Sequence, residues 1–261
     1  MVNLNKYSPF TKHFVLLLTF VLFLACSEKK YFVSKIEAKK ISISDKISPT
    51  ADIDAYIKPY REHIDADLNA ILAYNSETLD KSNGKWQTNI GSFLADVVLL
   101  KGNEIFLKRE NKQIDICLLN HGGIRSIIPK GNVTARNAFE VMPFENTAVI
   151  VALKSEQIMA LINYFITEKK PHPLSGLTFE IAKNNIAQNI LVQGKPLEND
   201  RIYYVITNDY LVNGGDNMTF FKSNSSVNDI NYKLRNMLID YFKDVDTLRV
   251  NKNIRITQLD K

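Results

Sequence analysis

Residues 118–126 of this chain have the sequence LLNHGGIRS, in which an apolar run gives way to two glycines, an arginine and one of the four histidines. The run itself, IDICLLN at residues 114–120, is typical of a buried strand. Glycine lets a backbone approach a ligand closely, and the planar fork of Arg125 suits a phosphate. By itself the segment fits a catalytic loop with a working histidine, a phosphate-binding turn or an ordinary turn after a strand.

Two other polar and aromatic segments lie beside predicted strands. VMPFENTAV (residues 141–149) overlaps the start of the apolar run TAVIVAL (147–153), and TNDYLVNGGDNMTFF (207–221) overlaps the end of IYYVITN (202–208). Strand ends are where sheets of α/β proteins usually place a ligand site. We therefore expect the three segments to form one site, provided that the fold brings them together.

The residue types in these segments match the chemistry of a nucleotide. Phe144 and Tyr210 offer flat faces for stacking on a base, and the amide of Asn146 can pair with base edges. Asp216 offers a carboxylate to the ribose hydroxyls, and Arg125 a guanidinium to a phosphate. Taken singly, each feature has a structural alternative: Phe144 as core, Tyr210 as a half-buried strand-end residue and the glycine pairs as turns. The nucleotide hypothesis therefore depends on the whole set.

Hydrophobic periodicity predicts the remaining elements. Apolar residues at spacings of three and four predict a long helix over residues 49–72, kinked at Pro59, with one apolar face. Further helices are predicted over residues 89–100, 155–167 and 229–242, and further strands over 177–182 and 189–192. Helices and strands alternate irregularly, without a strict βαβ repeat. This pattern predicts an α+β fold with a mixed β-sheet flanked by helices.

Residues 1–25 have the features of a signal peptide, with a basic start and the apolar core FVLLLTFVLFLA at residues 14–25. Cys26 follows directly, which resembles the lipobox of bacterial lipoproteins, although Phe23 and Leu24 are bulkier than that pattern allows. We expect Cys26 to be lipidated, residues 26–48 to form a polar linker and residues 49–261 to form the folded domain. The expected location is the bacterial cell envelope, with a lipid anchor to the membrane. In the alternative, residues 1–25 are a cleaved or uncleaved anchor and Cys26 is an apolar filler.

Charge and cysteine usage exclude several classes of function. The formal net charge is +5, and it falls by two if residues 1–25 are removed, which is too little to indicate a nucleic-acid partner. Cys117 lies within an apolar strand pattern and is expected to be a buried small hydrophobe. With two cysteines the chain has no disulfide framework and no cysteine-based metal site. The four histidines include no spaced pair suited to a dinuclear metal centre.

Three motifs in this order, LLNHGGIR, VMPFENT and NDYLVNGGD, resemble the C-terminal domain of the 5′-nucleotidase family. The resemblance extends over residues 49–222 and includes QTNIGSFLADVV at residues 87–98. It implies a domain that binds the nucleoside part of a nucleotide. It also implies that Phe144 and Tyr210 sandwich the base, with tyrosine where phenylalanine is common, and that Asn146 contacts the base.

The same resemblance implies roles for the other site residues. Asn120 and Gly123 match positions around the base and ribose, Asp216 matches the carboxylate that holds the ribose hydroxyls, and Arg125 matches an arginine that contacts phosphates. His121 occupies a position where the family usually has glycine or another small or polar residue. We therefore interpret His121 as a loop variant and not as a catalytic base.

Two departures from the family pattern bear on function. A further arginine, usual near the start of the QTNIG segment, is absent, and the nearby positions are Lys85, Trp86 and Ser92. Lys85 could replace it as a point charge, without the bidentate fork of arginine. The chain also has none of the Asp-x-His, Gly-Asn-His-Asp/Glu and Gly-His-x-His motifs that carry two divalent metals in the family's catalytic domain.

The leading hypothesis is thus a lipid-anchored nucleotide-recognition subunit without catalytic residues, metal ligands or a cofactor of its own. Divalent metals would be held by a separate metallophosphoesterase chain, its expected partner. One alternative is a surface protein that binds nucleotides or nucleosides and catalyses nothing. The other is a structural relic whose pocket no longer binds.

Overall fold

The computed structural model describes residues 9–24, 30–44 and 46–259, and it divides the chain into two units, Met1–Ile53 and Asp54–Lys261. The first unit contains the helix α1 (Pro9–Leu24). In the described part of the chain, no helix has both the length and the apolar character needed to cross a membrane. Cys26 lies outside the described residues, so its lipidation and the signal peptide stay predictions.

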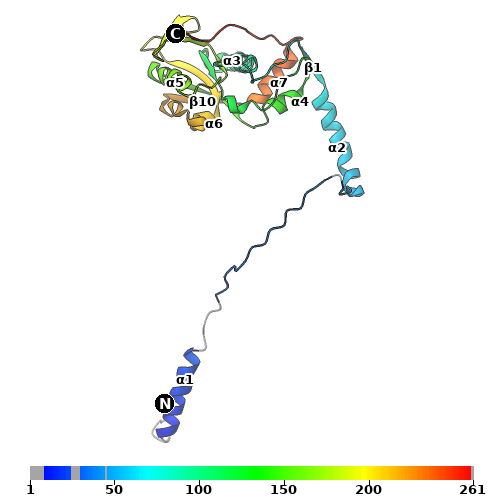
Figure 1. Cartoon of the computed structure of the whole chain (residues 1–261), viewed down its shortest axis with the longest axis vertical. Coiled ribbons are helices and arrows are strands. Elements are labelled where there is room, and N and C mark those ends of the chain that lie inside the picture. Colours follow the sequence, from blue (N-terminus) through cyan, green and yellow to red (C-terminus); the bar gives the residue numbers. More distant parts are fainter. Residues whose placement is uncertain (1–8, 25–29, 45, 260–261) are drawn as a thin grey trace. The chain divides into compact units, whose positions relative to one another are not determined.

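The second unit is built around a five-stranded mixed sheet, of which the edge strand β10 is labelled in Figure 1. The strand order is β10-β4-β9-β2-β5. The strands are β2 (Ile116–Leu118), β4 (Thr147–Leu153), β5 (Leu174–Ser175), β9 (Tyr203–Asn208) and β10 (Ser226–Lys233). β2 and β9 run parallel, and the other neighbours run antiparallel. The predicted mixed sheet is confirmed, and TAVIVAL is a strand over the predicted residues.

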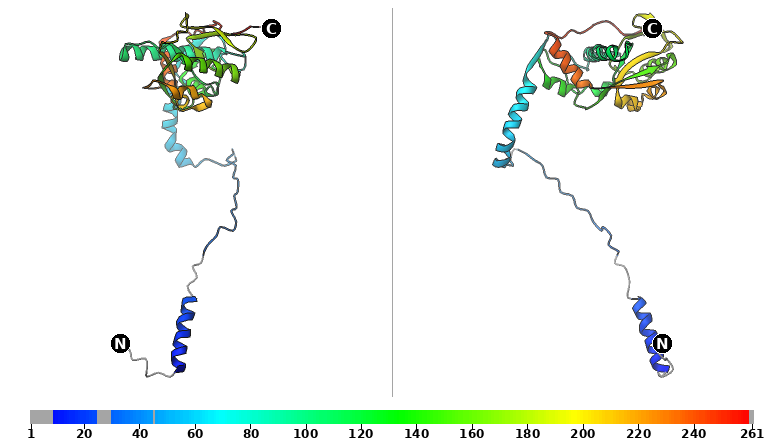
Figure 2. Two further views of the ribbon diagram at one scale, coloured as in Figure 1. Left: turned by 90° about the vertical axis from the view of Figure 1, so that its left-hand side faces the viewer. Right: turned by 180° about the vertical axis from the view of Figure 1, so that it is seen from behind.

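Helices cover both faces of this sheet, as predicted for the α+β class (Figures 1 and 2). Side chains alternate along a strand, and in β4 Ala148 and Ile150 join one core cluster while Val149 and Val151 join the other. The first cluster includes residues of α3 (Asn89–Glu110), α4 (Ala135–Val141) and α7 (Leu234–Asp244), and the second includes residues of α5 (Ser155–Glu168). The sheet is therefore buried on both faces, and a ligand can reach it at the ends of the strands.

The smaller sheets complete the unit. One is a two-stranded pair of β1 (Ile71–Asn75) and β3 (Gly131–Thr134), and the other has the order β11-β6-β7-β8. Its strands are β6 (Leu177–Ile181), β7 (Ala187–Val192), β8 (Lys195–Pro196) and β11 (Ile256–Gln258). Cys117 of β2 is fully buried, as predicted, and burial raises the pKa of its thiol.

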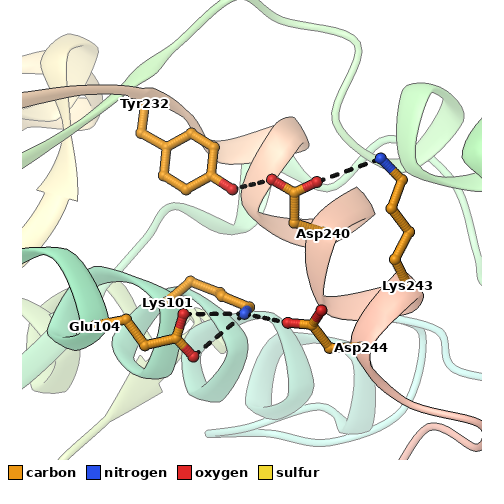
Figure 3. A network of polar contacts seen from close by, with 6 residues as sticks. All are labelled: Lys101, Glu104, Tyr232, Asp240, Lys243 and Asp244. Atoms are coloured by element: carbon orange, nitrogen blue, oxygen red, sulfur yellow. Dashed lines mark hydrogen bonds and ion pairs between the residues drawn. The ribbon is translucent and has the colours of Figure 1, made fainter.

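The helix α3 continues beyond the predicted end at residue 100, through Gly102 and on to Glu110. A Cβ atom at Gly102 would lie 2.3 Å from Cδ1 of Ile206, so glycine lets α3 pack closely on β9. α3 is also joined to α7 by the nearly buried Lys101, which forms ion pairs with Glu104 and with Asp244 (Figure 3). Tyr232 of β10 donates a hydrogen bond to Asp240 of α7 in the same region (Figure 3).

Two helix predictions need correction. The helix predicted over residues 229–242 begins only at Leu234, because the preceding residues pair with β4 as the edge strand β10. A register shift between Asp229 and Lys233 and a left-handed Asn231 (φ 51°) break the alternation that would have indicated a strand.

The second correction concerns α2 (Ala51–Asn69), which continues through Pro59. Ile71, assigned to this helix by spacing, belongs to β1. None of the residues of this helix is buried, and Ile53 and Tyr60, which belong to the predicted apolar face, are exposed.

Candidate functional site

The three segments singled out in the sequence converge at one end of the central sheet. The loop after β2 and the helical turn α6 (Asp209–Val212) follow the carboxyl ends of two adjacent parallel strands. β4 runs antiparallel to β9, with Ala148 opposite Asn208, so the segment that precedes β4 reaches the same edge. Strand direction thus brings together residues that are up to 96 positions apart.

A cavity of about 400 Å³ lies at this edge, within the usual size range of ligand pockets. All seven predicted site residues line it: Asn120, Gly123, Arg125, Phe144, Asn146, Tyr210 and Asp216. Its other lining residues are mainly apolar: Leu119, Gly122, Ile124, Met142, Pro173, Asn208 and Leu234. An apolar pocket with a few converging polar groups is the usual form of a small-molecule site.

The loop after β2 consists of Asn120 and a short 3₁₀ helix, η2 (His121–Gly123). The N–H of Gly123 donates to the carbonyl of Asn120 at 3.1 Å. A Cβ atom at Gly123 would lie 2.8 Å from Oδ1 of Asn120, so a larger residue would require the Asn120 side chain to move. The amide Nδ2 of Asn120 is then free to donate to Oδ2 of Asp216, at 2.9 Å.

Asp216 is held by its neighbours at every polar atom. Its second carboxylate oxygen, Oδ1, accepts a hydrogen bond from the hydroxyl of Tyr210 at 2.9 Å, and its backbone N–H donates to that hydroxyl oxygen at 3.2 Å. Its carbonyl accepts a hydrogen bond of 2.7 Å from the hydroxyl of Tyr164. A tyrosine hydroxyl is protonated at neutral pH, and burial raises the pKa of Tyr164 further, to about 12. The carboxylate therefore has a fixed orientation.

The two aromatic side chains are not part of the core. Phe144 and Tyr210 are each 47% exposed, and besides the main cavity they both line an adjoining open hollow of about 580 Å³. The alternative that places Phe144 in the core is therefore wrong, and both rings are accessible for stacking. The guanidinium carbon of Arg125 lies 6.0 Å from the centre of the Phe144 ring, at the limit of a cation–π contact.

Arg125 forms no ion pair with any residue of the described ranges, and its Nη1 donates to the carbonyl of Gly122 at 3.4 Å. Sequence reasoning missed Lys81. This residue precedes Ile124 by 43 positions, and its ammonium group donates to the carbonyl of Ile124 at 2.6 Å. Burial, and next the nearby charge of Arg125, lower the pKa of Lys81. Lys85, by contrast, lies over the ring of Trp86 at 5.4 Å, hydrogen-bonds Gln258 and does not line the cavity.

Behind the loop lies His172, a second residue that sequence reasoning missed. Its Nδ1 accepts a hydrogen bond of 3.2 Å from the backbone N–H of His121, and its side chain is almost fully buried. Burial lowers the pKa of His172 to about 4, so the ring is neutral at pH 7 and its proton lies on Nε2. Nδ1 of His121 and Nε2 of His172 are both buried without a hydrogen-bond partner. No group of three metal-binding side chains occurs among residues 9–24, 30–44 and 46–259.

Comparisons with known proteins show the family to which this domain belongs. The family described as "5'-nucleotidase, C-terminal domain" matches residues 68–223. Among curated relatives, the cell wall protein Lmo0130 of Listeria monocytogenes is 24% identical, with 82% of this chain and 29% of that protein covered. The 5′-nucleotidase of Vibrio parahaemolyticus is 21% identical, with 83% of this chain and 38% of the relative covered.

Solved structures show the same fold. The 5′-nucleotidase precursor of Thermus thermophilus superimposes with a TM-score of 0.65 and 25% identity, covering 80% of this chain and 42% of that structure. The NAD nucleotidase of Haemophilus influenzae gives a TM-score of 0.61 at 17% identity, covering 81% of this chain and 42% of that structure. The chain thus spans less than half the length of these relatives. Its sequence and its fold place it in the 5′-nucleotidase C-terminal domain family.

Proposed function

We propose that this chain is the nucleotide- or nucleoside-recognition part of a 5′-nucleotidase-type phosphoesterase that acts in nucleotide catabolism. The observation that carries the proposal is the convergence of all seven predicted site residues on one cavity of about 400 Å³. These residues come from three separate segments, which the order and direction of β2, β4 and β9 bring to one edge of the sheet. An open cavity also argues against a relic whose pocket has collapsed.

The cavity offers a distinct partner to each part of a nucleotide. The exposed rings of Phe144 and Tyr210 stack on the base, and the amide of Asn146 pairs with its edge. Asp216 accepts hydrogen bonds from the ribose hydroxyls, because each of its oxygens accepts only one bond from the protein and retains a free lone pair. Arg125, which has no acidic partner in the described part of the chain, contacts the phosphate.

Hydrolysis requires groups that the described residues do not supply. The family resemblance implies two divalent metals, and the described residues include no group of three metal-binding side chains to hold them. We therefore assign the metals and the bond-breaking step to a separate metallophosphoesterase chain, with this chain binding and orienting the substrate. The cell envelope is the proposed location, supported by the signal-peptide pattern and by the relative named as a cell wall protein.

The proposal is tested by binding and turnover measured on the same preparation. Calorimetric titration of the purified full chain with adenosine and AMP should give saturable binding. The same preparation should not hydrolyse AMP or UDP-sugars with added zinc, manganese or magnesium, and hydrolysis should appear when a co-purifying metallophosphoesterase is added.

Each outcome decides between the hypotheses. Binding without any turnover in the presence of that enzyme would favour the non-catalytic surface protein. Turnover that rises with the concentration of this chain alone would contradict the assignment of the metals to a partner. Absence of binding would refute nucleotide recognition itself.

A further inference from the structure

We propose that the hydroxyl group of Tyr210 is a positioning group that holds the carboxylate of Asp216 for a ribose, so that residue 210 links base stacking to sugar selection. This inference deepens the proposed function and rests on it. It assigns to the hydroxyl a role that a phenylalanine, the residue common at this position in the family, cannot perform.

The backbone of Asp216 explains why this side chain needs support. Asp216 has φ 50° and ψ 27°, a left-handed conformation that costs free energy for a residue other than glycine. Gly214 (φ 92°) and Asn217 (φ 59°) are left-handed as well. A carboxylate on such a turn keeps one orientation only where neighbouring groups fix it.

Tyr210 supplies two of the bonds that fix this carboxylate. Its hydroxyl donates to Oδ1 of Asp216 and accepts from the backbone N–H of the same residue, which closes a ring of two hydrogen bonds. Asn120 donates to Oδ2 from the other side. With a donor on each oxygen, the carboxylate plane cannot rotate without breaking a hydrogen bond to a charged group.

The local chain is built to bring the tyrosine ring to this position. α6 begins at Asn208, whose side chain accepts a hydrogen bond from the N–H of Leu211 and so fixes the turn that carries Tyr210. A Cβ atom at Gly215 would lie 2.4 Å from Cε1 of Tyr210, so the ring rests directly on the glycine backbone. Any larger residue at position 215 would displace the ring and separate the hydroxyl from Asp216.

The chemistry of the ligand follows from this arrangement. Each carboxylate oxygen keeps a free lone pair, so two adjacent hydroxyls of a ribose can be accepted without displacing Tyr210 or Asn120. A 2′-deoxyribose offers only one of the two hydroxyls. The fixed carboxylate therefore favours ribonucleosides, and this preference should depend on the Tyr210 hydroxyl as well as on Asp216.

Tyr210→Phe tests the proposal, because it keeps the ring and removes the hydroxyl. The full chain and the variant are titrated calorimetrically with adenosine and with 2′-deoxyadenosine. We expect the variant to bind 2′-deoxyadenosine within about twofold of the parent and adenosine about five- to tenfold more weakly. This loss is smaller than the full contribution of a hydrogen bond to a charged group, because the lost bond lies within the protein and not to the ligand. Tyr74→Phe is the matched control, since Tyr74 is 43% exposed, does not line the cavity and should leave both affinities unchanged.

A second readout needs no ligand. Amide hydrogen exchange at Asp216 should accelerate in Tyr210→Phe and stay unchanged in Tyr74→Phe, because only the first variant removes the acceptor of that N–H. A parent protein that binds neither nucleoside would refute the proposed function and this inference with it. If the parent binds and Tyr210→Phe keeps the same preference for ribose, or loses affinity equally for both nucleosides, the inference alone is refuted.

Discussion

Replacing Phe144 with alanine should separate the binding role of this ring from a structural one. The ring is 47% exposed and lines the cavity, so the variant removes a stacking surface and leaves no buried void. Stacking of a base on an aromatic side chain contributes about 1–3 kcal/mol, which corresponds to a loss of about five- to a hundredfold in affinity for adenosine. A core phenylalanine would instead cost about 3–5 kcal/mol of stability, and we expect about 1 kcal/mol or less here.

The assay combines calorimetric titration of adenosine with urea unfolding of the same samples. Tyr74→Ala is the control, because Tyr74 is exposed to a similar extent and lies outside the cavity. It should change stability by a comparable amount and leave the affinity for adenosine as it is. The reasoning is refuted if Phe144→Ala binds as tightly as the parent, or if its loss of affinity is matched by Tyr74→Ala.

Three other variants test the phosphate contact, the buried histidine and the core. Arg125→Ala should lower the affinity for AMP about tenfold and leave the affinity for adenosine unchanged, since only AMP carries the phosphate. Titrations that show equal losses of affinity for the two ligands would contradict this role. Burial lowers the pKa of His172 from 6.5 to about 4, so below pH 6.5 the unfolded chain binds a proton that the folded chain does not. The free energy of unfolding should therefore be unaffected by this group above pH 6.5 and should fall by up to about 3 kcal/mol as the pH drops toward 4. In urea unfolding at pH 7 and pH 5, His172→Gln should show a smaller fall than the parent, and an identical fall would rule His172 out as the cause. The buried Arg255 donates to Asp96 at 2.6 Å and to the carbonyl of Leu174, so Arg255→Ala should lower the free energy of unfolding by about 3–5 kcal/mol; a loss below about 1 kcal/mol would show that this ion pair does not stabilise the fold.

Local patterns in the sequence were sufficient to predict most of the central sheet. TAVIVAL is a strand over its whole length because an uninterrupted apolar run suits a strand covered on both faces, and β4 is covered on both. β10 escaped prediction because its partner, and not its own composition, makes it a strand. Its polar residues and its left-handed Asn231 obscure the period of two, and only pairing with β4 specifies the structure.

The sequence by itself determined which chemical groups are available at the site, since glycine pairs, aromatic residues and a carboxylate beside strand ends are local features. Whether they meet was decided by tertiary structure: Asn120 and Asp216 are 96 residues apart and touch only because β2 and β9 are adjacent and parallel. The same holds for Lys81 and His172, because no motif near them in the sequence indicates a place at the site. Lys81 contacts a carbonyl group and His172 an N–H group of the loop after β2, which is distant from both in the sequence. The exposed face of α2 shows the converse, because periodicity predicts that a helix has an apolar face, whereas burial of that face depends on a surface that packs against it.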